Sequence, residues 1–83
     1  MQIGVEISLY PLNADYIPPI RDFIARLNTE TRLRIVTNAM STQVFGEFDV
    51  VLPLLQTEIK RTFGANAKAV FVMKVLGPLA EAS

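Results

Sequence analysis

The sequence predicts an α+β fold, a ferredoxin-like sandwich in the order strand, helix, strand, strand, helix, strand. Two segments carry apolar side chains at helical spacing, and four others alternate in polarity or are rich in β-branched residues. Proline, glycine and asparagine separate these segments. With right-handed crossovers, this order gives a four-stranded antiparallel sheet whose first and third strands are central, with two helices on one face.

The first strand is predicted in residues 2–10, where aliphatic side chains alternate with polar or small ones. Pro11 has no N–H to donate to a ladder, so pairing is expected to end there. The aliphatic side should meet the helices. Glu6, Ser8 and Tyr10 should lie on the other side, where polar groups need partners.

The first helix is expected at about residues 15–28, because apolar side chains recur there at helical spacing. Asn13 or Asp15 can cap its N-terminus through the side-chain oxygen. Pro18 and Pro19 then fall in or near the first turn, where a missing N–H costs little.

A hairpin follows the first helix. Residues 33–38 and 42–45 alternate as strands, and Asn38–Ser41 is expected to form the turn between them. Gly46 is expected to end the second of these strands.

The second helix is predicted to start at an Asp49 cap and to end before Gly64, a suitable residue just past a helix end. Pro53 should limit how early its regular hydrogen bonds begin. The last strand is predicted at residues 67–76, ended by Gly77-Pro78. One domain is therefore expected over residues 1–78, followed by a short, loosely held tail at residues 79–83.

One face of the predicted sheet has no helix to cover it. The last strand can turn either side chains 71 and 73 or the lysines Lys68 and Lys74 toward that face. We expect Phe71 and Met73 there, with Val70 and Val72 in the core. The other side chains expected on this face are Glu6, Ser8, Tyr10, Val36, Asn38, Gln43 and Phe45. Such a face predicts a homodimer or homotetramer, closed through the open sheet face by a second copy.

The composition excludes several classes of function. Of the 83 residues 51% are hydrophobic, and eight basic residues balance eight acidic ones, so nothing favours nucleic acid binding. The chain has no His and no Cys, which removes the usual zinc ligands and nucleophilic mechanisms. No metal, no cofactor and no catalytic residue is expected. No signal peptide or membrane span is recognisable, and the expected location is the cytoplasm.

The remaining candidates are polar side chains near strand ends. Tyr10 can pack at the rim of the sheet or stack on a planar ligand. Asn38, Ser41 and Thr42 can be turn formers or hydrogen-bonding groups. Since the first strand runs antiparallel to the third, Ser8 and Tyr10 are expected nearer to Gly46-Glu47 and need not share a pocket with the turn.

Three segments in series carry a resemblance: Ser8-Leu9-Tyr10-Pro11-Leu12 with the following Asp15-Tyr16-Ile17, then Asn38-Ala39-Met40-Ser41-Thr42, then Gly46-Glu47-Phe48-Asp49-Val50. Over about residues 3–75 the chain resembles the YkoF-like, thiamine-binding protein family, as a small single-domain member. The resemblance implies a ferredoxin-like fold, assembly through sheets and binding of thiamine or its hydroxymethylpyrimidine part, and it does not imply an enzyme. It marks Ser8, Tyr10, Met40, Ser41, Thr42, Gly46 and Glu47 as motif positions.

The sequence therefore predicts a small-molecule-binding protein that serves salvage, transport or sequestration. An aromatic face, a carboxylate and a few short polar groups suit a thiazolium and an aminopyrimidine. The predicted ligand-binding residues are Ser8, Tyr10, Asn38, Ser41, Thr42 and Glu47. The alternative is a ligand-free regulatory or structural oligomerisation module. An enzyme such as an acylphosphatase and an RNA-binding domain rank lower, because their phosphate loop and aromatic RNA motif are missing.

Overall fold

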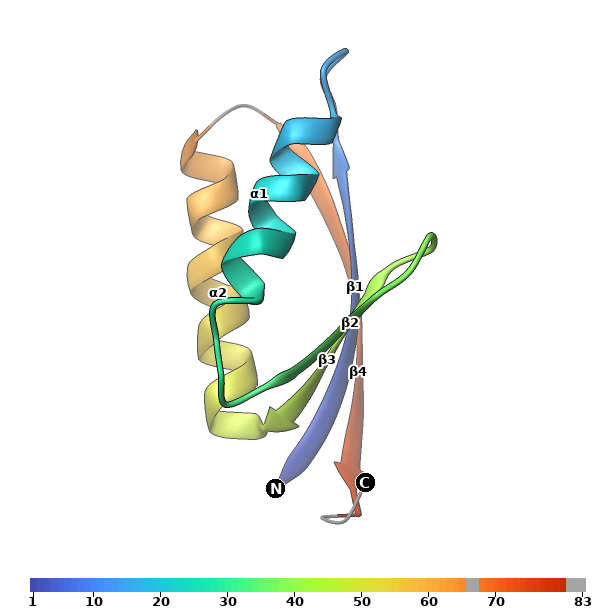
Figure 1. The fold of residues 1–83 in the computed structure, drawn as a ribbon, viewed down its shortest axis with the longest axis vertical. Coiled ribbons are helices and arrows are strands. Elements are labelled where there is room, and N and C mark those ends of the chain that lie inside the picture. Colours follow the sequence, from blue (N-terminus) through green and yellow to red (C-terminus); the bar gives the residue numbers. More distant parts are fainter. Residues whose placement is uncertain (66–67, 81–83) are drawn as a thin grey trace.

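A computed structural model describes residues 1–65 and 68–80 of the chain. It contains one open sheet with both helices on one side, as Figure 1 shows. The elements in chain order are β1 (Gln2–Pro11), α1 (Ile17–Leu27), β2 (Arg34–Thr37), β3 (Thr42–Glu47), α2 (Phe48–Ala65) and β4 (Ala69–Leu79). The strand order is β2-β3-β1-β4 with every neighbouring pair antiparallel, so the predicted ferredoxin-like architecture with β1 and β3 in the centre is confirmed.

The core lies between the helices and the aliphatic side of β1. Ile3, Val5 and Ile7 are at most 2% exposed, and α1 and α2 both pack over β1. The remaining fully buried apolar side chains come from α1, β3 and α2: Phe23, Leu27, Val44, Val51 and Leu55. The alternation seen in the sequence of β1 therefore sets which side of the sheet becomes the core.

Both helices begin differently from what the sequence indicated. Neither Asn13 nor Asp15 caps α1: Tyr16 is the N-cap residue and makes no side-chain cap hydrogen bond. The two prolines in the first turn lack an N–H, so fewer donors there need a cap. Asp49 lies inside the first turn of α2, where its charge suits the helix dipole, while Pro53 and Gly64 are accommodated within the helix.

The last strand differs from its prediction in which side chains face the helices and in its length. Phe71 pairs with Leu9 and lies on the helix side, where its ring is 5.1 Å from that of Phe23 and 5.5 Å from that of Phe63. The expectation that Phe71 and Met73 face outward was therefore wrong. Two aromatic rings on the helices offer Phe71 a better packed site than the open side does.

The outward side of β4 carries the valines that were expected in the core. Val70 and Val72 are 45% and 50% exposed, opposite Tyr10 and Ser8 of β1. Lys74 also lies on this side, opposite Glu6. The open face is thus both apolar and charged.

β4 also continues past the point where it was expected to stop. The Gly77-Pro78 peptide is cis, and Leu79 still pairs with Gln2 after a shift of register between Gln2 and Gly4. The strand accommodates the two residues as an irregularity in the ladder instead of ending at them. The predicted start at Ala67 and residues 81–83 of the predicted tail lie outside the described residues.

Candidate functional site

The β2–β3 turn diverges from β1 and leaves a hollow at one end of the sheet. The pairing of β1 with β3 runs from Gln2–Glu47 to Ile7–Thr42 and stops there. Beyond Ile7, β1 is paired only with β4, and the hairpin projects away from it in Figure 1. The hollow has a volume of about 340 Å³, within the range of about 300 to 1,000 Å³ usual for small-molecule sites. We call it the sheet-end hollow; residues 7–11, Tyr16, Ile20, Phe23, Ile24 and residues 37–42 line it.

Five of the six predicted site residues meet in the sheet-end hollow. Ser8 and Tyr10 come from β1, and Asn38, Ser41 and Thr42 come from the hairpin. The expectation that Ser8 and Tyr10 lie nearer to Gly46-Glu47 was wrong. In an antiparallel pair the end of one strand lies beside the start of the other, so the last residues of β1 adjoin the start of β3.

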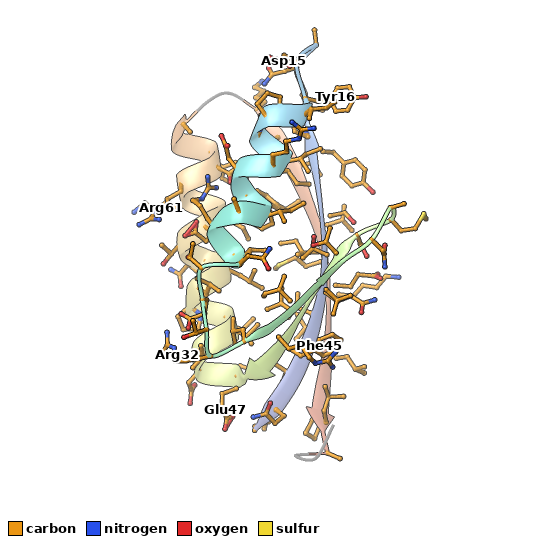
Figure 2. All side chains as sticks on the ribbon, viewed as in Figure 1. Asp15, Tyr16, Arg32, Phe45, Glu47 and Arg61 are labelled. Atoms are coloured by element: carbon orange, nitrogen blue, oxygen red, sulfur yellow. The ribbon has the colours of Figure 1, made fainter. Side chains whose placement is uncertain are left out.

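Glu47 lies at the opposite end of the sheet. Its carboxylate is 2.9 Å from the amino group of Met1, and Figure 2 shows Glu47 far from Tyr16 along the long axis of the molecule. Gln2, the first residue of β1, is its strand partner. Within one chain, Glu47 does not join the sheet-end hollow.

The turn is held in shape by its own polar groups. Asn38 Oδ1 accepts hydrogen bonds from the backbone N–H groups of Met40 at 2.8 Å and Ser41 at 3.1 Å. The backbone N–H of Asn38 donates to the carbonyl of Ser41, and the hydroxyls of Thr37 and Thr42 are 3.1 Å apart. The turn-forming role of Asn38 is therefore present, and it fixes the side of the hollow that faces β1.

Ser41 also links the turn to the open face of the sheet. Its hydroxyl donates to Glu6 Oε2 at 3.1 Å, and the other carboxylate oxygen of Glu6 is 3.8 Å from the amino group of Lys74. Glu6 does not itself line the sheet-end hollow. Its carboxylate contacts the hollow's lining through the Ser41 hydroxyl, and its negative charge is partly balanced by Lys74.

Tyr16 is a residue of the hollow that sequence reasoning did not select. It precedes α1 as the N-cap residue, and both it and Tyr10 are 54% exposed. The chain has two tyrosines and no tryptophan, and both tyrosines line the sheet-end hollow. The signal was present in the sequence as the Asp15-Tyr16-Ile17 segment of the resemblance. The apolar floor from Ile20, Phe23 and Ile24 could not be assigned without the direction of α1.

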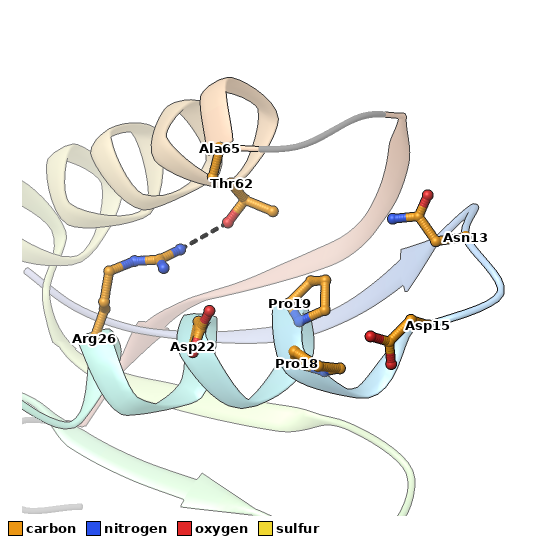
Figure 3. A pocket seen from close by; sticks show the side chains of 8 residues that line it. All are labelled: Asn13, Asp15, Pro18, Pro19, Asp22, Arg26, Thr62 and Ala65. Atoms are coloured by element: carbon orange, nitrogen blue, oxygen red, sulfur yellow. Dashed lines mark hydrogen bonds between the residues drawn. The ribbon is translucent and has the colours of Figure 1, made fainter.

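A second hollow, of about 400 Å³, lies between the two helices and is drawn in Figure 3. Arg26 crosses from α1 to α2, where its Nη2 donates to Thr62 Oγ1 at 2.8 Å and its Nε donates to Glu58 Oε2 at 2.6 Å. Glu58 is 4% exposed. Since the Arg26 guanidinium already has these partners, this region serves helix pairing.

A third hollow, of about 440 Å³, lies on the open face among Gly4, Glu6, Phe45, Lys74 and Leu76. The guanidinium of Arg34 lies 4.2 Å from the centre of the Phe45 ring, a cation–π contact that covers one side of the ring. This region lies on the outer side of the sheet and holds none of the short polar groups of the turn.

The described residues give no sign of a metal site or of a membrane span. Residues 1–65 and 68–80 contain no group of three or more acidic side chains that could hold a metal ion. No helix in this part of the chain is long and apolar enough to cross a membrane.

The fold resembles several solved structures. A protein from Streptococcus pneumoniae superposes with a TM-score of 0.87 at 22% sequence identity, covering 95% of this chain and 89% of that one. A candidate thiamine biosynthesis/salvage protein from Thermotoga maritima gives 0.82 at 16% identity, covering 90% and 82%. A domain of unknown function, DUF77, from Bacillus cereus gives 0.72 at 19% identity, covering 94% and 77%.

The sequence matches no protein-family model, and no curated protein is similar enough to count as a match. At identities of 16% to 22%, the three structural likenesses establish the fold. One of these neighbours is named for thiamine biosynthesis or salvage.

Proposed function

We propose that this protein binds thiamine or its hydroxymethylpyrimidine part in the sheet-end hollow, for salvage, transport or sequestration, without catalysing a reaction on it. The observation that carries the proposal is the meeting of Ser8, Tyr10, Asn38, Ser41 and Thr42 around one hollow, together with Tyr16. The first five of these residues are predicted from the sequence as ligand-binding residues and come from two separate segments of the chain. Their convergence supports a common role that turn formation alone does not require.

The chemistry of the lining suits a flat heteroaromatic ring. Two exposed tyrosines offer aromatic faces, and Ile20 and Ile24 offer an apolar floor. The hydroxyl of Ser8 can donate to a ring nitrogen or accept from an amino group, and the oxygen of Ser41, whose proton goes to Glu6, can accept from an amino group. The neighbour named for thiamine biosynthesis/salvage adds support from its fold and name.

Isothermal titration calorimetry with thiamine and with hydroxymethylpyrimidine tests the proposal on the purified chain. We expect saturable heat with a Kd in the micromolar range for at least one of them. Tyr10→Ala should weaken binding at least tenfold because it removes an aromatic wall, whereas Glu47→Gln, at the other end of the sheet, should leave the affinity unchanged. Absence of heat with both compounds at high micromolar concentration would refute the proposal.

A ligand-free oligomerisation module is the second candidate. It is favoured by the exposed apolar side chains of β4, because Val70, Val72 and Leu76 are 45%, 50% and 64% exposed. A chain that self-associates, yet gives no heat with either compound, would fit this candidate.

A further inference from the structure

The end of the β1–β3 ladder leaves one backbone position of β1 facing the sheet-end hollow. The N–H of Leu12 donates to the carbonyl of Lys68, one residue beyond the last pair of β1 and β4, Pro11–Ala69. Hydrogen-bonded and non-hydrogen-bonded pairs alternate along an antiparallel ladder. Tyr10 and Ser8 therefore bond to β4, whereas the N–H and C=O of Leu9 point the other way, toward the β2–β3 turn.

No residue of β3 meets these two groups of Leu9. The ladder between β1 and β3 stops at Ile7–Thr42, one hydrogen-bonding position before Leu9. Among residues 1–65 and 68–80, no backbone hydrogen bond joins Leu9 to the turn. The contact to the turn from the residue next to Leu9 is a long one, 3.5 Å from Ser8 Oγ to the Met40 carbonyl. Leu9 itself lines the sheet-end hollow. One donor and one acceptor thus stand side by side, where a further strand residue would otherwise pair.

The same hollow is neutral. Its described lining contains aliphatic, aromatic, hydroxyl and amide side chains and no Asp, Glu, Lys or Arg. The carboxylate of Glu6 lies outside this lining, where it accepts a hydrogen bond from Ser41 and pairs with the amino group of Lys74. Removing a charged ligand group from water costs several kcal/mol unless an opposite charge meets it, so this lining disfavours a phosphate ester and gives a thiazolium cation no carboxylate.

We propose that the sheet-end hollow selects an uncharged aminopyrimidine, whose amino group donates to the Leu9 carbonyl while the adjacent ring nitrogen accepts from the Leu9 N–H. The ligand then takes the place of the missing strand residue, with Tyr10 and Tyr16 beside its ring. This inference rests on the proposed function and names the ligand within it: hydroxymethylpyrimidine, in preference to thiamine or a phosphorylated form.

The first test compares affinities by calorimetry for hydroxymethylpyrimidine, its monophosphate, thiamine, and the same pyrimidine without the amino group. We expect the monophosphate to bind at least tenfold more weakly and thiamine no more tightly than the free pyrimidine. Loss of the amino group should cost about tenfold, which corresponds to one hydrogen bond of about 1.4 kcal/mol. Affinity for the free pyrimidine should be nearly independent of salt, since no charge pair forms.

The second test measures amide hydrogen exchange by NMR on the intact chain. Without ligand, the Leu9 N–H should exchange faster than those of Ser8 and Tyr10, which bond to β4. Hydroxymethylpyrimidine at saturation should slow exchange at Leu9 at least tenfold and shift its amide resonance, with little change at Glu47 as an internal control.

The outcomes separate this inference from the proposed function. If thiamine or the monophosphate binds tenfold more tightly than the free pyrimidine, the selectivity is overturned while the proposed function stands. The same holds if the pyrimidine binds and the Leu9 amide does not respond. If none of the compounds produces heat, the proposed function fails and this inference fails with it.

Discussion

At the scale of single residues, Gly77 and Gly64 differ in the space around their α-carbons. A Cβ added at Gly77 would lie 2.7 Å from Cγ2 of Ile3, which is 2% exposed, whereas a Cβ at Gly64 would meet nothing within 4 Å. Gly77 therefore permits the close approach of β4 to β1 at the register shift. Gly64 lies in α2, where glycine only adds entropy to the unfolded chain.

Alanine at these two positions should change stability in opposite directions. We expect Gly77→Ala to lower the free energy of unfolding by about 1 to 3 kcal/mol through overpacking against Ile3. Gly64→Ala should raise it by about 0.5 to 1 kcal/mol through better helix propensity. Urea unfolding monitored by circular dichroism measures both, and a Gly77→Ala variant as stable as the wild type would contradict the close packing.

Glu30 is the residue whose titration the structure alters most clearly. Arg32 donates to its carboxylate from Nε, Nη2 and the backbone N–H, at 2.8, 2.8 and 2.9 Å. These hydrogen bonds lower the pKa of Glu30 from 4.5 to about 2. A folded pKa below the unfolded one means that the contribution to stability is present above about pH 4.5 and is lost as the pH falls toward 2.

Arg32→Gln should therefore raise the pKa of Glu30 back toward 4.5. An NMR titration of the side-chain carboxyl carbon measures this directly. Lys60→Gln removes the same charge from α2 and should leave the titration of Glu30 unchanged. Equal titration curves in wild type and Arg32→Gln would show that Arg32 is not the cause.

At the scale of elements, a network of polar side chains joins the two helices. Arg26 of α1 bonds Glu58 and Thr62 of α2, and Arg61 approaches Glu58 at 3.2 Å. Glu58 is buried, whereas the Arg26 side chain is 27% exposed and can reach water. Removing only the carboxylate should therefore cost less than breaking a fully buried pair.

A double-mutant cycle tests this network. We expect Glu58→Leu to lower the free energy of unfolding by about 1 to 3 kcal/mol, because Arg26 loses its charged partner. Arg26→Met combined with Glu58→Leu should come within about 1 kcal/mol of the wild type, since it replaces both partners by apolar groups. If the two substitutions are additive in thermal or urea unfolding, the coupling between the helices is absent.

The elements show where sequence reasoning succeeded and where it could not. In β1, one side of the alternation is aliphatic and the other polar, so its core side was predictable. In β4, residues 69–73 are apolar at every position, and only the rings of Phe23 and Phe63 decide that Phe71 turns inward. Five of the six predicted site residues line the sheet-end hollow. Their meeting depends on the direction and extent of the β1–β3 ladder, which composition does not encode.

At the scale of the whole molecule, the part of the chain that the structure describes covers the sheet on one side only, as Figure 1 shows. The helices lie over β1 and β3, and the outward side of β4 exposes Val70, Val72 and Leu76. β4 is also an edge strand of eleven residues with a single charged side chain, Lys74. Such a surface is typical of an interface, so self-association through the open face stays a prediction of this structure.

Light scattering with size exclusion tests that prediction at micromolar concentration. We expect a dimer or tetramer for the wild type and a shift to monomer for Val72→Lys, which places a charge in the apolar part of the open face. Gln56→Lys adds the same charge on the exposed side of α2 and should leave the assembly intact. A wild type that is monomeric under these conditions would rule out association through this face.

Tyrosine fluorescence tests most directly the proposed binding of a small heteroaromatic ligand in the sheet-end hollow. Tyr10 and Tyr16 are the only tyrosines, there is no tryptophan, and both line that hollow, so the emission of the chain reports on this site. Titration with hydroxymethylpyrimidine should change the emission saturably, with the same Kd as calorimetry, and a smaller change should remain in Tyr10→Phe and in Tyr16→Phe. Binding heat without any change in tyrosine emission would place the ligand elsewhere and contradict the claim.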